Sequence, residues 1–150
     1  MTSANCLLSR NVAVGLSART KEELLRTLSA RAANATGVDE AQVLAALNNR
    51  EQLGSTGVGR GIAIPHAPVA GIEAPFAFLA TLDRPVDYDA IDDEPVDIVF
   101  LVLSPMGDAS SALKVLSFAA RSLRSEDTLH NVRAARDEEQ LFNAVQMLSA

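Results

Sequence analysis

Apolar residues follow two different spacings along this chain, and the change of spacing predicts where helices and strands lie. In the first third they recur as on one face of a helix, behind the start pattern Thr20–Glu23 and again behind Asp39–Gln42. In the middle they form runs at 76–82 and 98–103, and the second run is continuous, as in a strand covered on both faces. The pattern therefore predicts two amphipathic helices ahead of the main strands.

Helical spacing returns in the last third of the chain, after Gly107. The first helix there is predicted to turn one apolar face to the core, formed by Leu113, Leu116, Ala120 and Leu123. Two shorter helices are predicted at 125–135 and 137–148. Gly37 and Gly54 are expected to end the two N-terminal helices.

The order of these elements predicts an α/β fold. A short strand at 12–16 precedes the first helix, a turn is expected at Asp83–Pro85, and the hairpin-like link at 83–97 joins the two main strands. Because helices lie both before and after the strands, we predict a mixed β-sheet flanked by helices on its faces. No linker or repeat divides the chain, so residues 1–150 are expected to form a single domain.

Composition and charge narrow the possible functions. The chain has 150 residues, 48% of them hydrophobic, and a net charge of −6, which predicts a globular protein without the basic face that nucleic-acid binding requires. No apolar stretch approaches the length of a membrane span, and the first residues lack the charged start of a signal peptide. The single cysteine, Cys6, cannot form an internal disulfide. We therefore expect a cytoplasmic protein.

The segment GIAIPHAP, residues 61–68, holds the strongest candidate for chemistry. His66, one of two histidines in the chain, lies between Pro65 and Pro68 directly after an apolar run. Proline fixes its own backbone and keeps the preceding residue extended, so His66 is expected to leave the end of a strand in one orientation. Such a histidine is suited to act as a nucleophile near neutral pH, although a lone histidine can also be purely structural.

A glycine-rich segment, GSTGVGRG at 54–61, precedes this histidine. It lacks the lysine and the Ser/Thr of a P-loop and is followed by a strand-like run, so it is not a nucleotide-binding P-loop. Its backbone N–H groups can form an anion-binding nest, although a plain flexible turn has the same composition. Arg50, at the end of the second helix, is placed to reach the same site. Imidazole, guanidinium and backbone donors together are suited to hold a phosphoryl group.

The other titratable residues are weaker candidates. Seven carboxylates from Asp83 to Asp97 lack the alternate spacing of a calcium loop and are expected to form a solvated acidic turn. His130 is expected on the surface of a polar helix, and Cys6 lies too close to the terminus to be nominated as a nucleophile. No metal-binding or serine-hydrolase motif is present, so no metal site is predicted.

Several stretches together resemble a known family. NREQLGSTGVGRGIAIPHAP is similar to the active-site segment of the enzyme IIA proteins of the bacterial phosphotransferase system, in the fructose/mannitol and nitrogen-regulatory class. The likeness continues through VDYDAIDDEPVDIVFLVLSP and ALKVLSFAARSL to DEEQLFNAV, and so covers most of the chain from Arg50 onward. With no transporter segment attached, the chain looks most like the nitrogen-regulatory branch.

The resemblance implies a phosphoryl-transfer site. It implies that His66 accepts a phosphoryl group on Nε2 from a phosphocarrier protein, and that Arg50 is the family's arginine near the phosphate. Three loop residues match the family's phosphate-binding loop: Ser55, Thr56 and Gly57. No metal, nucleotide or other cofactor is implied, because phosphohistidine already carries an activated phosphoryl group.

One position departs from the family pattern. Ala112 stands where the family has a second histidine that faces the phosphorylated one, and Lys114 is turned away from Ala112 on a helix. Three functions therefore stay open: a regulator whose phosphorylation state changes which proteins it binds, a binding module that no longer cycles phosphate, and a sugar-transport enzyme IIA. The chain is an enzyme, a phosphotransferase component, only if it cycles phosphate.

Overall fold

The helices and strands follow the predicted order along the chain. The computed structural model describes residues 11–146, so Cys6 lies outside the described residues. Within them the elements are β1 (Val12–Leu16), α1 (Lys21–Thr36), α2 (Glu40–Gln52), β2 (Gly57–Gly59), β3 (Ile62–Ala63), β4 (His66–Val69), β5 (Phe76–Val86), β6 (Val96–Pro105), α3 (Ala109–Ser122), α4 (Glu126–Ala134) and α5 (Glu138–Gln146). None of the helices in this part of the chain combines the length and apolar character that crossing a bilayer requires.

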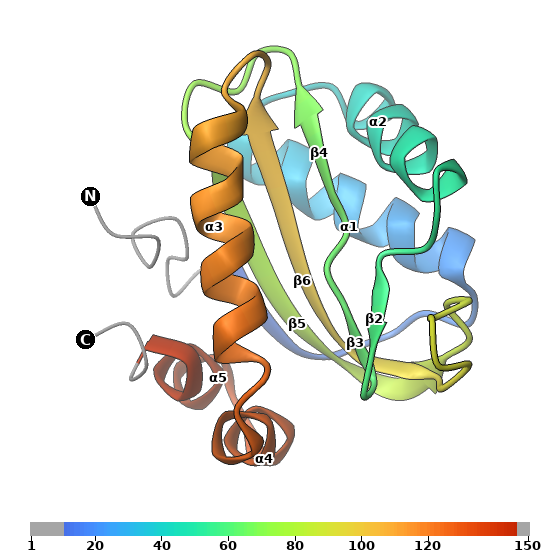
Figure 1. Cartoon of the computed structure of the whole chain (residues 1–150), viewed down its shortest axis with the longest axis vertical. Helices are drawn as coiled ribbons and strands as arrows, with labels where there is room; N and C mark the ends of the chain where they lie inside the picture. Colours follow the sequence, from blue (N-terminus) through green and yellow to red (C-terminus); the bar gives the residue numbers. More distant parts are fainter. Residues whose placement is uncertain (1–10, 147–150) are drawn as a thin grey trace.

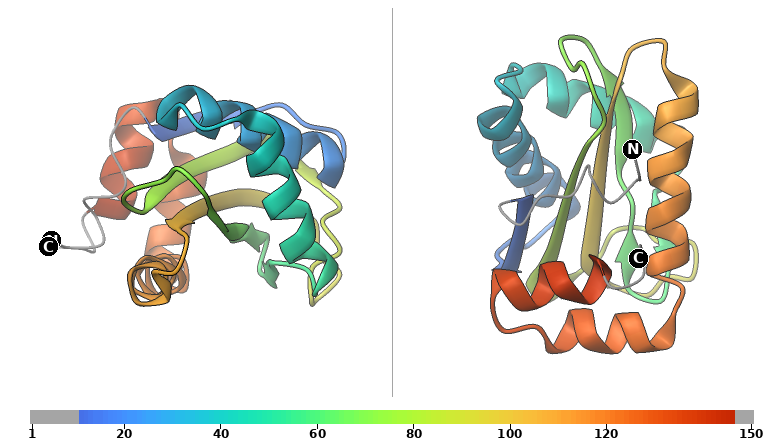
Figure 2. Two further views of the ribbon diagram at one scale, coloured as in Figure 1. Left: turned by 90° about the horizontal axis from the view of Figure 1, so that it is seen from above. Right: turned by 90° about the vertical axis from the view of Figure 1, so that its left-hand side faces the viewer.

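The strands form one mixed sheet. Their order is β1-β5-β6-β3-β2, and β4 pairs with β6 as well (Figure 1). β5 and β6 run antiparallel, whereas β1 is parallel to β5, and β3 and β4 are parallel to β6. Helices cover both faces of the sheet, as Figure 2 shows. The predicted α/β fold, a mixed sheet flanked by helices in a single domain, is confirmed.

Two apolar layers, one on each face of the sheet, make up the core. β6 contributes to both, because successive side chains of a strand point to opposite faces. Leu101 and Leu103 belong to the layer with α1 and α2, whereas Phe100 and Val102 belong to the layer with α3, α4 and α5. This double burial explains why residues 98–103 form a continuous apolar run in the sequence.

The predicted ends of the first two helices are largely confirmed. Thr20 begins α1 by accepting a hydrogen bond from the N–H of Glu23 at 3.1 Å, and Gly37 ends it in the left-handed conformation at φ +81°. Asp39 is the N-cap of α2, but its side chain makes no capping hydrogen bond, so that part of the prediction is wrong. α2 ends two residues before Gly54.

β5 is longer than the sequence predicted. It continues through Asp83–Pro85 to Val86, so the turn expected there is wrong. The pairing of β5 with β6 shifts register between Thr81 and Val86. Pro85 lies within this irregular part of the ladder, which is where a strand tolerates a residue without an N–H. The chain reverses later, between Val86 and Val96.

The buried face of α3 also differs from the prediction. The buried residues of α3 are Val115, Phe118, Ala119 and Ser122. Leu113 is 64% exposed and Leu116 is half-buried, whereas Leu123, just after the helix, is buried as expected. Leu113 and Leu116 instead line a groove beside His66. The apolar stripe therefore belongs in part to this groove and only in part to the core.

The strand that lies beside β6 near the site is interrupted. β3 stops at Ala63 and β4 begins at His66, with Pro65 between them. The carbonyl oxygen of Pro65 accepts a hydrogen bond from the N–H of Val102 at 2.9 Å, and His66 pairs with Val102. The prediction that His66 leaves the end of a strand is therefore wrong, because pairing to β6 resumes at this residue.

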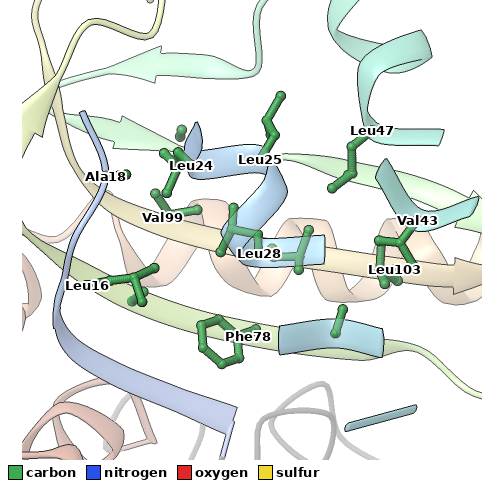
Figure 3. Packing of buried hydrophobic residues seen from close by; sticks show 14 of the residues in the cluster. Leu16, Ala18, Leu24, Leu25, Leu28, Val43, Leu47, Phe78, Val99 and Leu103 are labelled. Atoms are coloured by element: carbon green, nitrogen blue, oxygen red, sulfur yellow. The ribbon is translucent and has the colours of Figure 1, made fainter. Parts of the chain in front are cut away.

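The layer under α1 gives a prediction for stability. Leu28 is fully buried in α1 and belongs to the same cluster as Phe78 of β5 (Figure 3). We predict that Leu28→Ala lowers the free energy of unfolding by about 2–5 kcal/mol, because it leaves a cavity against the sheet. Leu113→Ala, at an exposed position of α3, should change it by less than about 0.5 kcal/mol. Urea unfolding followed by circular dichroism measures both, and equal losses would contradict this packing.

Candidate functional site

The imidazole of His66 is bound on both of its ring nitrogens. Nδ1 lies 2.8 Å from the carbonyl oxygen of Ile64, and Nε2 lies 3.3 Å from Nε of Arg50. A carbonyl oxygen can only accept and a guanidinium can only donate, so Nδ1 carries the proton and Nε2 offers its lone pair. The surroundings thus select the neutral tautomer in which Nε2 is the nucleophilic nitrogen. The ring itself is half-buried.

Arg50 reaches the histidine from the last turn of α2, a helix that packs against β4. Its Nη1 donates a hydrogen bond to the carbonyl oxygen of Gly54 at 2.9 Å, which holds the guanidinium over the start of the loop. The structure therefore brings Arg50 and His66 together, although 16 positions separate them in the chain. A guanidinium has five N–H donors in a planar fork, so it can bind the oxygens of a phosphoryl group beside Nε2.

The three predicted loop residues directly follow Gly54, and their side chains and N–H groups form hydrogen bonds with neighbouring residues of the protein. Ser55 Oγ donates to the carbonyl oxygen of Tyr88 at 3.0 Å and accepts from the N–H of Gly57 at 3.1 Å. The N–H of Thr56 donates to the Glu51 carboxylate at 3.0 Å, and the Thr56 hydroxyl donates to the same carboxylate. The N–H groups of Thr56 and Gly57 are thus engaged by side chains. Direct phosphate contact by Ser55, Thr56 and Gly57 stays a prediction.

A buried polar cluster next to the site was not predicted. The Glu51 carboxylate accepts from Lys21 Nζ at 2.9 Å, from Tyr88 Oη at 3.1 Å and from both donors of Thr56. Burial alone would raise the pKa of Glu51, but the hydrogen bonds from Thr56 and the charge of Lys21 outweigh it and hold the pKa below its ordinary value. Burial, together with the charge of Glu51, raises the pKa of Tyr88, so its hydroxyl keeps its proton.

The only sequence signal for this cluster was local. Glu51 directly follows Arg50, and Thr56 lies in the glycine-rich loop, but Tyr88 is 37 positions away from Glu51. Neither spacing nor periodicity connects residues so far apart in sequence, so the pairing appears only once the chain is folded.

A groove of about 390 Å³ opens beside the imidazole. His66 and Val102 lie on one side of it, and Ala112, Leu113 and Leu116 of α3 line the other. The position where the family pattern has a second histidine therefore faces the same groove as His66. A methyl group there leaves the groove largely apolar and supplies no hydrogen-bond donor to the site.

The segment that links β5 to β6 packs against the glycine-rich segment at 54–61. Asp92 accepts a hydrogen bond from the N–H of Arg60 at 3.0 Å, so this carboxylate is not merely solvated as the sequence predicted. Gly57 passes so close to the link that an added Cβ would lie 2.8 Å from Cβ of Ala90. Only glycine fits at this position without displacing the link.

The remaining candidates do not join the site. His130 is exposed on α4, as predicted. Among residues 11–146 no group of three or more histidine, cysteine or acidic side chains is arranged to hold a metal ion. The described site therefore consists of one imidazole whose Nε2 lone pair accepts from a guanidinium, a hydrogen-bonded loop and an adjacent apolar groove.

Comparisons with known proteins identify the family of this chain. The profile of the family described as "Phosphoenolpyruvate-dependent sugar phosphotransferase system, EIIA 2" matches residues 6–147. A nitrogen regulatory protein of Bradyrhizobium diazoefficiens is 41% identical over 130 residues, which is 87% of this chain and 85% of the relative.

Solved structures share the fold. Nitrogen regulatory protein IIA-Ntr from Neisseria meningitidis superposes with a TM-score of 0.89 at 26% identity, covering 95% of this chain and 97% of that one. Escherichia coli enzyme IIA for mannitol, solved with phosphorylated enzyme IIB, has a TM-score of 0.78 at 18% identity, covering 94% and 97% of the two chains. The predicted resemblance is confirmed: this chain belongs to the EIIA type 2 family of the phosphotransferase system, in its nitrogen-regulatory branch.

Proposed function

We propose that this chain is a cytoplasmic phosphohistidine regulator of the nitrogen-type phosphotransferase system. His66 takes a phosphoryl group from a phosphocarrier protein, and the phosphorylation state then decides which proteins the chain binds. The observation that carries the proposal is the pair of hydrogen bonds on the His66 ring, from Nδ1 to Ile64 and from Arg50 to Nε2. They leave one nitrogen able to attack phosphorus and place a cation beside it.

The transfer can be written from these atoms. The Nε2 lone pair attacks phosphorus on the carrier's phosphohistidine, the carrier's P–N bond breaks, and its electron pair returns to the carrier's nitrogen. The Nδ1 proton stays between His66 and Ile64 throughout. Arg50 exchanges its hydrogen bond to Nε2 for one to the phosphoryl oxygens, where its charge stabilises the group in transit.

Ala112 favours a second candidate, a binding module that acts by protein contact without cycling phosphate. Ala112 lines the groove beside His66, so no second imidazole is available there to share the charge of the phosphoryl group. The same residue weakens the third candidate, a sugar-transport enzyme IIA, which must pass phosphate onward rapidly. The two leading candidates differ in whether His66 is phosphorylated at all.

The first prediction separates these candidates. With phosphoenolpyruvate, enzyme I and a phosphocarrier, the wild-type chain should gain the mass of one phosphoryl group, located on His66 by mass spectrometry. The modification should be lost in acid and kept in base, as for a phosphoramidate. His66→Ala should abolish the gain, whereas His130→Ala, which removes the other, exposed histidine, should not. Undiminished labelling of His66→Ala would reject His66 as the acceptor.

The second prediction concerns the guanidinium. Arg50→Lys keeps the positive charge but loses the planar fork, so we expect phosphorylation about tenfold slower, equivalent to about 1.4 kcal/mol of transition-state stabilisation. Arg136→Lys, an exposed change between α4 and α5, is the matched control. Quench-flow rates with a phosphorylated carrier measure the effect, and a wild-type rate for Arg50→Lys would remove the arginine from the mechanism.

The third prediction concerns Ala112. Ala112→His places an imidazole in the groove that His66 lines, where one hydrogen bond to the charged phosphoryl group is worth about 1.5 kcal/mol. Both loading of His66 and return of phosphate to unlabelled carrier should therefore become roughly tenfold faster. Ser117→His, on an exposed part of α3, controls for a histidine elsewhere on the helix. If neither rate rises in Ala112→His, the alanine at this position has no effect on phosphoryl transfer.

A further inference from the structure

Glu51 is a charged side chain that takes no part in the proposed reaction. It nevertheless lies next to Arg50 in the chain and binds Thr56 of the loop. Its side chain is only 7% exposed. It accepts hydrogen bonds from Lys21, Thr56 and Tyr88, and Lys21 Nζ also lies 4.5 Å from the centre of the Tyr88 ring. A buried carboxylate is retained at a cost in desolvation, and here that cost is offset by four donors.

The carboxylate is connected to His66 by a short series of hydrogen bonds. Glu51 holds both the N–H and the hydroxyl of Thr56. The carbonyl oxygen of Thr56 accepts from the N–H of Ile64 at 3.0 Å, and the carbonyl oxygen of Ile64 lies 2.8 Å from Nδ1 of His66. Through Thr56 and Ile64, these hydrogen bonds connect the buried Glu51 carboxylate to Nδ1 of His66, the ring nitrogen that must keep its proton.

A second connection runs through the backbone of α2. Arg50 directly precedes Glu51 in the last turn of the helix, and its guanidinium contacts the other ring nitrogen of His66. Fixing the Glu51 side chain to the loop therefore fixes the end of α2 relative to His66. Both hydrogen bonds of the imidazole are therefore connected to this one carboxylate, one through the loop and one through the helix.

We propose that Glu51 is a positioning residue for phosphoryl transfer: bound by Lys21, Thr56 and Tyr88, it holds the loop and the end of α2 so that His66 keeps its proton on Nδ1 and presents Nε2 to Arg50. The inference rests on the proposed function for its effect on rate. Its effect on the histidine ring is independent of that function.

The chemistry of the carboxylate explains why an amide cannot replace it. Glu51 only accepts at both oxygens, and each of its partners donates. A glutamine has one accepting oxygen, and its NH₂ group would face donors from Thr56, Tyr88 or Lys21. Ionisation of Glu51 is favoured because Thr56 and Lys21 hold its pKa below the ordinary value. Glu51→Gln therefore keeps the shape of the side chain but replaces one of its two accepting oxygens with a donor.

The test compares the tautomer of His66 with its rate of phosphorylation in full-length variants. Ring ¹⁵N chemical shifts, measured without any phosphate donor, should show one tautomer in the wild type, with the proton on Nδ1. Glu51→Gln should give a mixture of tautomers and phosphorylate roughly tenfold more slowly, because small displacements of a reacting group reduce rates steeply. Thr56→Val, which removes one hydroxyl donor, should shift the ring in the same direction. Glu139→Gln, the same acid-to-amide change at an exposed position of α5, should behave as wild type.

The outcomes distinguish positioning from simple stabilisation. If Glu51→Gln and Thr56→Val melt at lower temperature but keep the Nδ1 proton and the wild-type rate while folded, the proposal is overturned. If Glu51→Gln does not fold, Thr56→Val compared with the wild type decides by the same two measurements. If the variants change the tautomer but the wild type accepts no phosphate, positioning by Glu51 is supported and the phosphoacceptor function is what fails.

Discussion

The imidazole of His66 is held between the carbonyl oxygen of Ile64 and the guanidinium of Arg50, and these two contacts set the requirements for the surrounding structure. The carbonyl must point at Nδ1, so the chain leaves regular pairing with β6 at Ile64 and Pro65 and resumes it, in the same direction, at His66. The guanidinium must reach Nε2, so α2 has to end beside β4. The proposed phosphoryl transfer needs little else from the protein, because a phosphohistidine donor already carries an activated phosphoryl group.

The fold meets both requirements by using the central strand as a frame. β6 is buried on both faces and pairs in succession with β3 and β4, so the interruption between them lies against a strand of the core. α1 and α2 cover one face, and α3 covers the other and forms the far wall of the groove beside His66. A change at Ala112 therefore alters the site without disturbing the core, which lies on other residues of α3.

Much of this arrangement could be predicted from local sequence. The continuous apolar run at 98–103 predicted the central strand. The prolines on either side of His66 predicted a backbone of restricted conformation at this residue. The pairing of Glu51 with Tyr88 could not be predicted, because the segment between β5 and β6 that carries Tyr88 meets the end of α2 only in the folded chain. The prediction that Leu113 faces the core was wrong for a related reason. Periodicity detects an apolar face but does not say whether that face packs against the core or lines a groove.

The position of the phosphoryl group on the imidazole tests this explanation of the site most directly. Phosphorylated wild-type protein, labelled with ¹⁵N in its histidines, can be examined by ¹⁵N and ³¹P NMR to find which ring nitrogen of His66 is bonded to phosphorus. Phosphorus on Nε2, with the proton retained on Nδ1, is the result expected from the contacts with Arg50 and Ile64. Phosphorus on Nδ1 would contradict it, since that nitrogen would have to abandon the Ile64 carbonyl on which the orientation of the ring depends.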